Sequence, residues 1–303
     1  MIRYLGYAAA FKAFSLTPRT RRLYRRLGNT RGAKRRARAG LPDSYLCRAK
    51  DVLELANRHW VPRPQARLLE LGTGWLPWES TVLRLVYDLD ATLFDVWDNR
   101  QWDAFRVYFA GLADRIDSLP LETAERMRVS ERLGEILGCR SFPDVYARLG
   151  FEYIVDPSGS LASLEDDSMD VVLSVNTLEH VDRSILPQYV LDIARVLRPG
   201  GVAFHTIDLD DHLADYDGTV SRKQYMAYSD RVWRLAFQSA VHYYNRVQSP
   251  EWRRLFGVAG LELVEEHARG VDLDGIRVHR SYAWLDPVER SCVELRLVYS
   301  KPT

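Results

Sequence analysis

One short stretch, residues 68–77 (Leu-Leu-Glu-Leu-Gly-Thr-Gly-Trp-Leu-Pro), limits what the chain can fold into more than any other. Residues 67–71 are short and mostly apolar, as in a buried strand of a parallel sheet. Gly72 and Gly74 then allow a tight turn and let a ligand approach the backbone where a Cβ would block it. A following helix would direct its N-terminal N–H groups at that ligand. The stretch therefore predicts a strand, a glycine turn and a helix that bind a nucleotide-like cofactor.

The glycine pattern narrows the choice of cofactor. A dinucleotide fold has Gly-x-Gly-x-x-Gly, but the third glycine position is Pro77 here. A phosphate-binding P-loop ends in Gly-Lys-Ser/Thr, which does not follow these glycines. What remains is an acid followed by Gly-x-Gly at residues 70–74. Alone, this pattern fits a cofactor turn and an ordinary strand–turn–helix equally well.

Strand and helix signals alternate along the chain. Helices are expected over residues 43–59, 81–87 and 186–197, and strands over residues 67–71, 91–97, 151–155, 170–175 and 202–207. Residues 101–150 look helical throughout and form a predicted insertion, and a second insertion covers about residues 209–250. Such alternation predicts an α/β fold with a doubly wound, mainly parallel sheet.

Charge is distributed unevenly, although the formal net charge is only +1. Residues 1–40 contain 12 Lys/Arg and no Asp/Glu, which leaves 30 basic against 41 acidic residues in the rest of the chain. We expect residues 1–60 to form a basic N-terminal helical arm and residues 61–303 the main domain. The favoured interpretation is an arm packed on the acidic body or on a partner subunit. An anionic membrane surface, a mitochondrial presequence and contact with nucleic acid stay open as alternatives.

The number of cysteines and the hydropathy of the sequence indicate the cellular compartment. Cys47, Cys139 and Cys292 are scattered and odd in number, and no Cys-x-x-Cys pair is present. The sequence therefore indicates neither a disulfide framework nor a cysteine zinc site. No run approaches the ~20 apolar residues of a membrane span. These observations predict a cytoplasmic protein, which would be peripheral at the membrane if the arm binds lipid.

Three further motifs follow the glycine turn in order: residues 166–172 (Asp-Asp-Ser-Met-Asp-Val-Val), 178–181 (Leu-Glu-His-Val) and 197–201 (Leu-Arg-Pro-Gly-Gly). With residues 70–74 and an acid after the second strand, the series resembles the class I S-adenosylmethionine-dependent methyltransferases, particularly the small-molecule group. The resemblance covers about residues 65–208. It implies a Rossmann-like, mainly parallel seven-stranded sheet. Residues 252–259, 261–265 and 293–300 look like the family's last helix and its closing antiparallel hairpin.

The resemblance implies S-adenosylmethionine as the cofactor. Four residues match the turn that holds its methionine moiety: Glu70, Gly72, Thr73 and Gly74. Asp98, at the expected end of the second strand, matches the acid that binds the ribose hydroxyls. Asp95 is the alternative if that strand ends earlier.

The chain departs from the family pattern in two places. No acid stands near Ser158, where the family usually binds the adenine amine, so Asp156 or the backbone at Ala162 and Ser163 would take that part. Asn176, at the exit of the fourth strand, is also predicted to contact the cofactor. Trp75 replaces a commoner small residue and either covers the cofactor or packs in the core.

Methyl transfer from a sulfonium is an in-line displacement, which mainly requires alignment of donor and acceptor and exclusion of water. An oxygen acceptor usually also needs a base. The predicted catalytic residues follow the fourth and fifth strands, where ligands of open α/β sheets bind: His180, His205 and Asp208, with His212 as a further candidate. His180 also belongs to a motif that is frequent in the family whatever the acceptor. His205 is alternatively a core residue inside its strand.

The second insertion is rich in aromatic and polar residues, among them Tyr225, Trp233 and Tyr244. These side chains suit either a pocket for a sugar or aromatic ring or the core of a helical cap. The nearby cluster of His205, Asp208, Asp210, Asp211 and His212 is compatible with a divalent cation. Such clusters are more often solvated loops, so no metal is predicted.

The sequence thus predicts a methyltransferase that acts on a small-molecule acceptor, at an oxygen of a sugar-containing or secondary metabolite. Two alternatives stay open: a methyltransferase acting on a membrane-associated lipid or polysaccharide intermediate, and a non-catalytic cofactor-binding protein. Nucleic acid is disfavoured as a partner, because residues 174–177 lack the Asp/Asn-Pro-Pro-aromatic sequence of exocyclic-amine DNA methyltransferases. A homodimer is a further expectation.

Overall fold

A computed structural model describes residues 1–273 and 275–303. Contacts group the chain into two compact units. Unit 1 comprises residues 1–28, 175–191 and 205–297, and unit 2 comprises residues 29–174, 192–204 and 298–303. The sequence-based division into an arm (1–60) and a main domain (61–303) follows a different criterion and stays a prediction.

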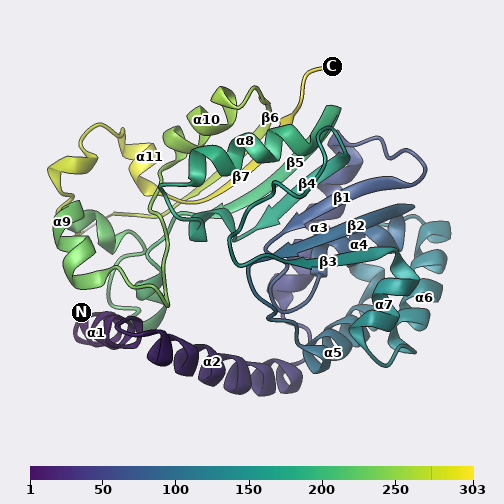
Figure 1. Ribbon diagram of the computed structural model, residues 1–303, viewed down its shortest axis with the longest axis horizontal. Coiled ribbons are helices and arrows are strands. Elements are labelled where there is room, and N and C mark those ends of the chain that lie inside the picture. Colours follow the sequence, from purple (N-terminus) through teal and green to yellow (C-terminus); the bar gives the residue numbers. More distant parts are fainter. Residues whose placement is uncertain (274) are drawn as a thin grey trace. The chain divides into compact units, whose positions relative to one another are not determined.

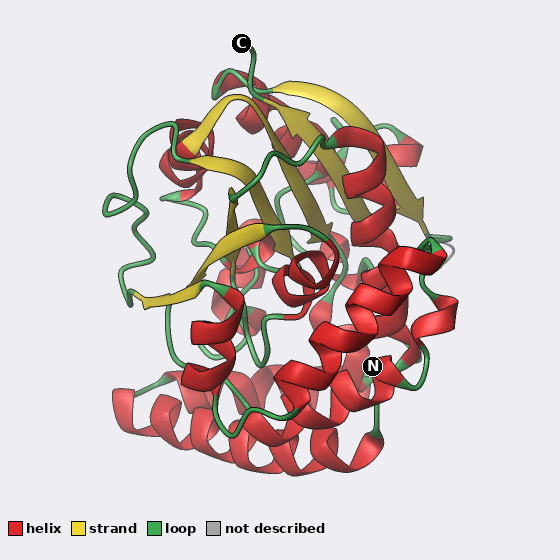
Figure 2. Ribbon diagram, turned by 90° about the vertical axis from the view of Figure 1, so that its right-hand side faces the viewer, coloured by secondary structure: helices red, strands yellow, loops and turns green. Residues whose placement is uncertain are grey.

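The strands form one seven-stranded sheet in the order β3-β2-β1-β4-β5-β7-β6 (Figure 1). Strand β1 (Ala66–Leu71) pairs in parallel with β2 (Leu89–Asp95) and β4 (Met169–Val175), and β2 pairs in parallel with β3 (Phe151–Val155). In register, Leu68 lies opposite Ala91 and Val171. The sheet shows the twist that is usual for open sheets (Figure 2).

The last strands close the sheet in the antiparallel sense. Strand β5 (Leu197–Asp208) bonds to β7 (Cys292–Ser300) and its continuation, from Gly200 N to Lys301 O and from Leu209 N to Val293 O. The partner number falls as the β5 number rises, so the two strands are antiparallel. Strand β6 (Glu262–Gly270) lies at the edge. The predicted doubly wound, Rossmann-like sheet with a closing antiparallel hairpin is confirmed.

The helices of unit 2 include the first predicted insertion. Helix α3 (Asp43–His59) precedes β1, and α4 (Trp78–Val86) follows it. Helix α5 (Trp102–Ala113), the short η1 (Ile116–Ser118), α6 (Thr123–Leu137) and α7 (Phe142–Leu149) occupy residues 101–150, which confirms that this insertion is helical. Aromatic packing joins them to the sheet helices, since the Phe109 ring lies 4.8 Å from that of Trp78.

Several strand boundaries differ from the prediction, and two of the differences have a clear physical reason. Strand β2 ends at Asp95 and not at residue 97, because the Asp95 carboxylate accepts a hydrogen bond from the next N–H, that of Val96 (2.7 Å), and turns the chain there. Helix α8 (Leu186–Val196) stops where expected, but β5 begins at once at Leu197. Residues 197–201, which end the helix, are therefore also the first residues of a strand, because the backbone of Gly200 and Gly201 forms hydrogen bonds with that of Lys301.

Unit 1 contains α1 (Ile2–Ser15), the first half of α2 (Pro18–Ala39) and the second insertion. The insertion consists of single turns: η3 (His212–Tyr216), η4 (Gln224–Ala227), α9 (Asp230–Val232) and η5 (Trp233–Phe237), with α10 (Ser249–Val258) after it. Further short turns are η2 (Leu178–His180), η6 (Arg280–Tyr282) and α11 (Pro287–Ser291). Tyr225, Trp233 and Tyr244 are buried in one apolar cluster with Tyr4 and Phe11 of α1. The aromatic residues of the insertion thus form a core.

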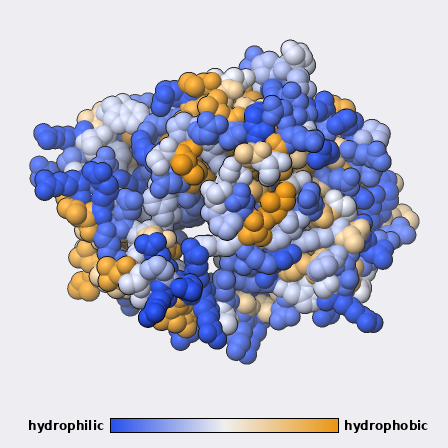
Figure 3. Space-filling model, viewed as in Figure 1, coloured by the Kyte–Doolittle hydropathy of each residue, from blue (hydrophilic) through white to orange (hydrophobic). Residues whose placement is uncertain are grey.

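The helices and the visible surface were compared with what a membrane-spanning protein requires. Within residues 1–273 and 275–303, no helix combines the length and the apolar character needed to cross a bilayer. Hydrophilic side chains dominate the face in Figure 3, and the apolar groups there form small patches.

Candidate cofactor and acceptor sites

The glycine turn of unit 2 follows β1 directly. Gly72 and Gly74 have φ values of 71° and 66°, a conformation that disfavours a side chain. Gly72 N donates a hydrogen bond to Phe94 O (2.8 Å), and Gly74 N donates one to Asp95 Oδ2 (2.9 Å). The tip of β2 therefore holds the turn by its backbone and by a carboxylate.

Glu70 lies at the base of this turn and is buried. Its Oε2 accepts hydrogen bonds from the N–H (3.1 Å) and the hydroxyl of Ser80, in the first turn of α4. Burial, and then the charge of Glu79, raise the pKa of Glu70 to about 8. Glu79 itself is bound by Arg48 through two hydrogen bonds, of 2.6 and 2.8 Å. Glu70 therefore anchors the helix after the turn, and it would act on a cofactor through the backbone that it holds.

The two candidate ribose acids have different surroundings. Asp95 is the last residue of β2, is buried, and touches the glycine turn. Asp98 lies three residues beyond the strand, is half exposed, and binds Arg100 through Nη2 (2.7 Å). That partner holds the pKa of Asp98 below its usual value, whereas burial raises the pKa of Asp95. The ribose role of Asp98 stays a prediction, and the alternative residue now stands at the tip of the strand.

The remaining predicted cofactor residues are placed as follows. Thr73 is buried, and its hydroxyl has no hydrogen-bond partner in the described part of the chain. Ser163 is exposed in the segment between β3 and β4, and Asp156 binds the N–H and the hydroxyl of Ser158 (2.9 and 2.7 Å). Asn176 belongs to unit 1, is exposed, and has a φ of 50°. Only Thr73 shares the turn with Glu70 and the glycines.

Arg36 of the basic helix α2 contacts the glycine turn. This contact was not predicted from the sequence. The Arg36 guanidinium lies 3.5 Å from the centroid of the Trp75 ring, and its Nε donates to Gln101 Oε1 (2.8 Å). Gln101 N in turn donates to Trp75 O (2.8 Å). Trp75 is 38% exposed. It is therefore not a core residue, and one face of its ring is covered by the arm.

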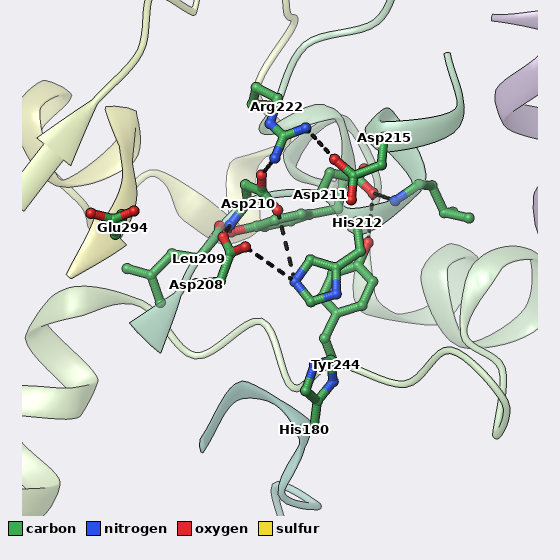
Figure 4. A network of polar contacts seen from close by, with 12 residues as sticks. His180, Asp208, Leu209, Asp210, Asp211, His212, Asp215, Arg222, Tyr244 and Glu294 are labelled. Atoms are coloured by element: carbon green, nitrogen blue, oxygen red, sulfur yellow. Dashed lines mark hydrogen bonds and ion pairs between the residues drawn. The ribbon is translucent and has the colours of Figure 1, made fainter. Parts of the chain in front are cut away.

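A second group of polar residues, in unit 1, follows β4 and β5. His180 lies in η2, and its Nδ1–H donates to Tyr243 O (2.7 Å). Its ring centroid is 5.2 Å from that of His212, which is 4.5 Å from that of Tyr244. Loss of hydration lowers the pKa of both imidazoles, an effect that the Tyr243 carbonyl and Asp208 partly oppose for His180. The structure thus brings His180, His212 and Asp208 into one cluster (Figure 4).

His205 lies apart from this cluster. It is 2% exposed, and its ring stacks on Phe256 at 5.0 Å. Burial lowers its pKa to about 3, so the ring is neutral at physiological pH. This placement agrees with the core interpretation of the residue, and such an enclosed ring cannot reach an acceptor without rearrangement of the strand.

The loop after β5 is held by residues that are distant in sequence. Asp211 accepts hydrogen bonds from the hydroxyls of Tyr4 (2.7 Å) and Tyr244 (2.6 Å) and from Leu213 N (3.0 Å). Burial raises the pKa of Asp211 to about 6 despite these donors. Tyr4 belongs to α1, so the N-terminal helix has a structural part in this loop. Nothing in the sequence around Tyr4 signals this contact.

The chain belongs to a methyltransferase family, because residues 35–266 match the family's methyltransferase domain. S-adenosylmethionine is accordingly the methyl donor. The glycine turn fits this cofactor, since it combines two left-handed glycines, a Thr73 hydroxyl that has no hydrogen-bond partner among the described residues, and an acid at the adjacent strand tip. No protein of curated function matches the chain.

Several solved structures are similar to the chain at low identity. Phosphoethanolamine N-methyltransferase 2 of Haemonchus contortus, in complex with S-adenosylmethionine, is 13% identical with a TM-score of 0.45, over 84% of this chain and 52% of that one. A protein of Bacillus halodurans that is assigned as a methyltransferase is 13% identical with a TM-score of 0.46, over 84% of this chain and 99% of that one. A protein that is assigned as a methyltransferase, in complex with the Trm112 methyltransferase activator of Haloferax volcanii, is 17% identical with a TM-score of 0.40, over 84% and 94%. These likenesses carry no argument about the acceptor.

Proposed function

We propose that the protein transfers the methyl group to an oxygen of a small-molecule acceptor, of the sugar-containing or secondary-metabolite class, with His180 as the base. The hydrogen bond from His180 Nδ1–H to Tyr243 O carries this proposal. A carbonyl oxygen only accepts, so Nδ1 must hold the proton and Nε2 must present the basic lone pair. Because the pKa of His180 is lowered, that nitrogen is unprotonated near neutral pH.

Each residue has a distinct part in the proposed reaction. S-adenosylmethionine, bound at the glycine turn, supplies an activated methyl group, so the protein mainly has to align the acceptor and exclude water. His180 Nε2 takes the hydroxyl proton as the acceptor oxygen is methylated. The negative charge of Asp208 raises the pKa of His180 and so favours the imidazolium that results. Asp208 is thus a positioning and electrostatic residue.

The test measures release of S-adenosylhomocysteine with panels of hydroxylated and of amine acceptors. Activity confined to hydroxylated compounds is expected. His180→Gln should lower kcat by ~10²–10⁴-fold, the usual contribution of a general base, and leave the Kd for S-adenosylmethionine unchanged. The control is His267→Gln, an exposed histidine of the edge strand β6. Turnover with amines alone, or full activity of His180→Gln, would refute the proposal. Binding without turnover on any acceptor would favour a non-catalytic cofactor-binding protein.

A second candidate is an acceptor at an anionic membrane surface. Helix α2 contains ten Lys/Arg and no Asp/Glu, and Arg36 is its one buried residue. Exposed basic residues near an anionic surface contribute ~1 kcal/mol each. Sedimentation with anionic and with neutral vesicles tests this proposal, with Arg19, Arg22 and Arg31 replaced by Glu in the variant. Equal sedimentation of wild type and variant would exclude the helix as an anchor.

The cellular setting and the oligomeric state are also proposals. Cys47, Cys139 and Cys292 are all free thiols, as the reducing cytoplasm would require. Sedimentation velocity on the full chain tests the homodimer, and fractionation of cells in low and high salt tests peripheral attachment to a membrane.

A further inference from the structure

Three side chains of the loop after β5 converge on one point in unit 1. Asp208 is the last residue of β5, and His212 is the first residue of η3. His212 Nε2 lies 3.8 Å from Asp208 Oδ2 and 3.7 Å from Asp210 Oδ1. One ligand atom of each residue lies within 4.8 Å of the other two. Figure 4 shows both carboxylates turned toward the same ring nitrogen.

These separations are too long for hydrogen bonds, whose heavy atoms lie within ~3.2 Å of each other. They are close to the distances between ligands that share an ion. Two atoms bound at ~2.1 Å to an ion at the tetrahedral angle are ~3.4 Å apart. A contraction of a few tenths of an ångström therefore brings His212 Nε2 to the separation from each carboxylate oxygen that a shared ion requires, and the two oxygens already lie within 4.8 Å of each other.

The second observation is an unsatisfied buried carboxylate oxygen. Asp210 is 2% exposed. Its Oδ2 pairs with Arg222, whereas its Oδ1, directed at His212, has no hydrogen-bond donor among residues 1–273 and 275–303. His212 Nε2 is likewise buried without a hydrogen-bond partner in the described residues. Unpaired polar atoms in the interior are destabilising, so a ligand bound by both Asp210 Oδ1 and His212 Nε2 would remove two such costs.

The surroundings hold these groups in place. Asp208 Oδ1 accepts from Asp210 N (3.0 Å), and Lys223 Nζ donates to Leu209 O (2.9 Å), which fixes the backbone between the two carboxylates. Arg222 binds Asp215 as well as Asp210, so its one positive charge is divided. Outer partners of this kind usually orient metal ligands.

We propose that Asp208, Asp210 and His212 form a binding site for a divalent transition-metal ion. An imidazole together with two carboxylates suits Zn²⁺ or Mn²⁺ better than Mg²⁺, which prefers oxygen ligands alone. Three protein ligands leave at least one coordination position open, as in metal sites that bind a further molecule. The proposal goes beyond the proposed acceptor chemistry and does not depend on it.

The first test is direct binding. The full chain is treated with EDTA, desalted, and titrated calorimetrically with Zn²⁺, Mn²⁺ and Mg²⁺ in separate experiments. One Zn²⁺ or Mn²⁺ per chain is expected, with Mg²⁺ at least ~10-fold weaker because it binds imidazole poorly. Absence of Zn²⁺ and Mn²⁺ binding would overturn the proposal, whatever the methyl acceptor proves to be.

The second test locates the ion. His212→Gln and Asp210→Asn should each weaken binding by ~100-fold or more, since even outer-sphere changes cost 10–100-fold. Asp215→Asn is the matched control, because it shares Arg222 but offers no ligand to the ion. Circular dichroism checks the fold of each variant. If either variant unfolds, imidazole NMR signals of the wild type decide, since Zn²⁺ must shift His212 and not the core residue His205. Equal affinity of wild type and both variants, or a shift at His205 alone, would refute the site.

Discussion

Buried ionisable groups have hydrogen-bond partners in the glycine turn of unit 2, whereas some of those in the loop after β5 of unit 1 lack them. At the turn, Glu70 is bound by Ser80, and Glu79 by both nitrogens of a guanidinium fork. In the loop, one oxygen of Asp210 and the ring nitrogen of His212 lack hydrogen-bond partners within the described residues. A region whose charges are satisfied can hold a backbone shape for a ligand. A region with unsatisfied groups is itself arranged to bind something.

Among the substitutions that test this contrast, we expect the largest effect, on the affinity for S-adenosylmethionine, at the carboxylate of Asp95 at the tip of β2. Asp95→Ala removes the acceptor of the Gly74 N–H and a candidate ribose ligand. Hydrogen bonds to charged groups contribute ~1.5–3 kcal/mol each, so the Kd for S-adenosylmethionine should rise by ~100-fold. Asp98→Ala, which loses the pair between a half-exposed carboxylate and the partly buried Arg100, should change the Kd by less than ~10-fold. Calorimetric titration with S-adenosylmethionine and S-adenosylhomocysteine measures both, and the reverse order of effects would restore Asp98 as the ribose acid.

This pair of acids also shows how far the sequence could lead. Periodic apolar runs and glycine stops predicted strands β1 to β5, because those signals are local, whereas β6 and β7 were expected from the resemblance to the methyltransferase family. The end of β2 was placed two residues too late, since it depends on a hydrogen bond that the Val96 N–H donates to the Asp95 carboxylate. Tyr4 and Arg36 were missed altogether, because each acts across more than 35 residues of intervening sequence. Local sequence patterns were thus sufficient to predict the first five strands and the glycine turn. The loop after β5 could not be predicted in this way, because it depends on contacts with residues that are distant in sequence.

The next largest effect, on the free energy of unfolding, is expected at Lys223, which contacts the loop after β5. Lys223 is fully buried, and its Nζ donates to Leu209 O, Tyr225 Oη (2.8 Å) and Gln248 Oε1 (3.1 Å). Lys223→Met removes three hydrogen bonds, although Leu209 O keeps the Tyr225 hydroxyl (2.8 Å) as a donor, so the free energy of unfolding should fall by ~1–3 kcal/mol. Urea unfolding measures the change, with the exposed Lys34→Met as the control. An unchanged stability would show that the loop is held by other contacts.

The same substitution has a definite pH dependence. Burial lowers the pKa of Lys223 to about 7, well below its unfolded value of ~10.4. Between these values the unfolded chain binds more protons than the folded chain, so the wild type gains stability as pH rises. The stability difference between wild type and Lys223→Met should therefore grow from pH 7 to pH 9. A difference that shrinks over this range would contradict the lowered pKa.

A pH dependence of opposite sign is expected at the glycine turn. The folded pKa of Glu70 is raised to about 8, whereas its unfolded value is ~4.3. Between these values the folded chain binds more protons, so the contribution of Glu70 to stability falls as pH rises. Glu70→Gln lacks this titration, so its stability relative to wild type should rise between pH 5.5 and pH 8.5. Unfolding in urea at both pH values measures the gain, and a constant difference would mean that Glu70 is ionised throughout.

The smallest effect concerns the contact between the basic helix and the turn. Arg36 covers one face of Trp75 and binds Gln101, which itself holds the Trp75 carbonyl. A cation–π contact of this kind contributes ~0.5–1 kcal/mol, so Arg36→Ala should raise the Kd for S-adenosylmethionine by ~2–5-fold. Arg35→Ala is the matched control, because it removes the same charge from an exposed neighbouring position. Equal Kd values for the two variants would mean that α2 affects the turn through its net charge, and a weaker affinity of Arg36→Ala alone would make the contact with Trp75 part of the cofactor site.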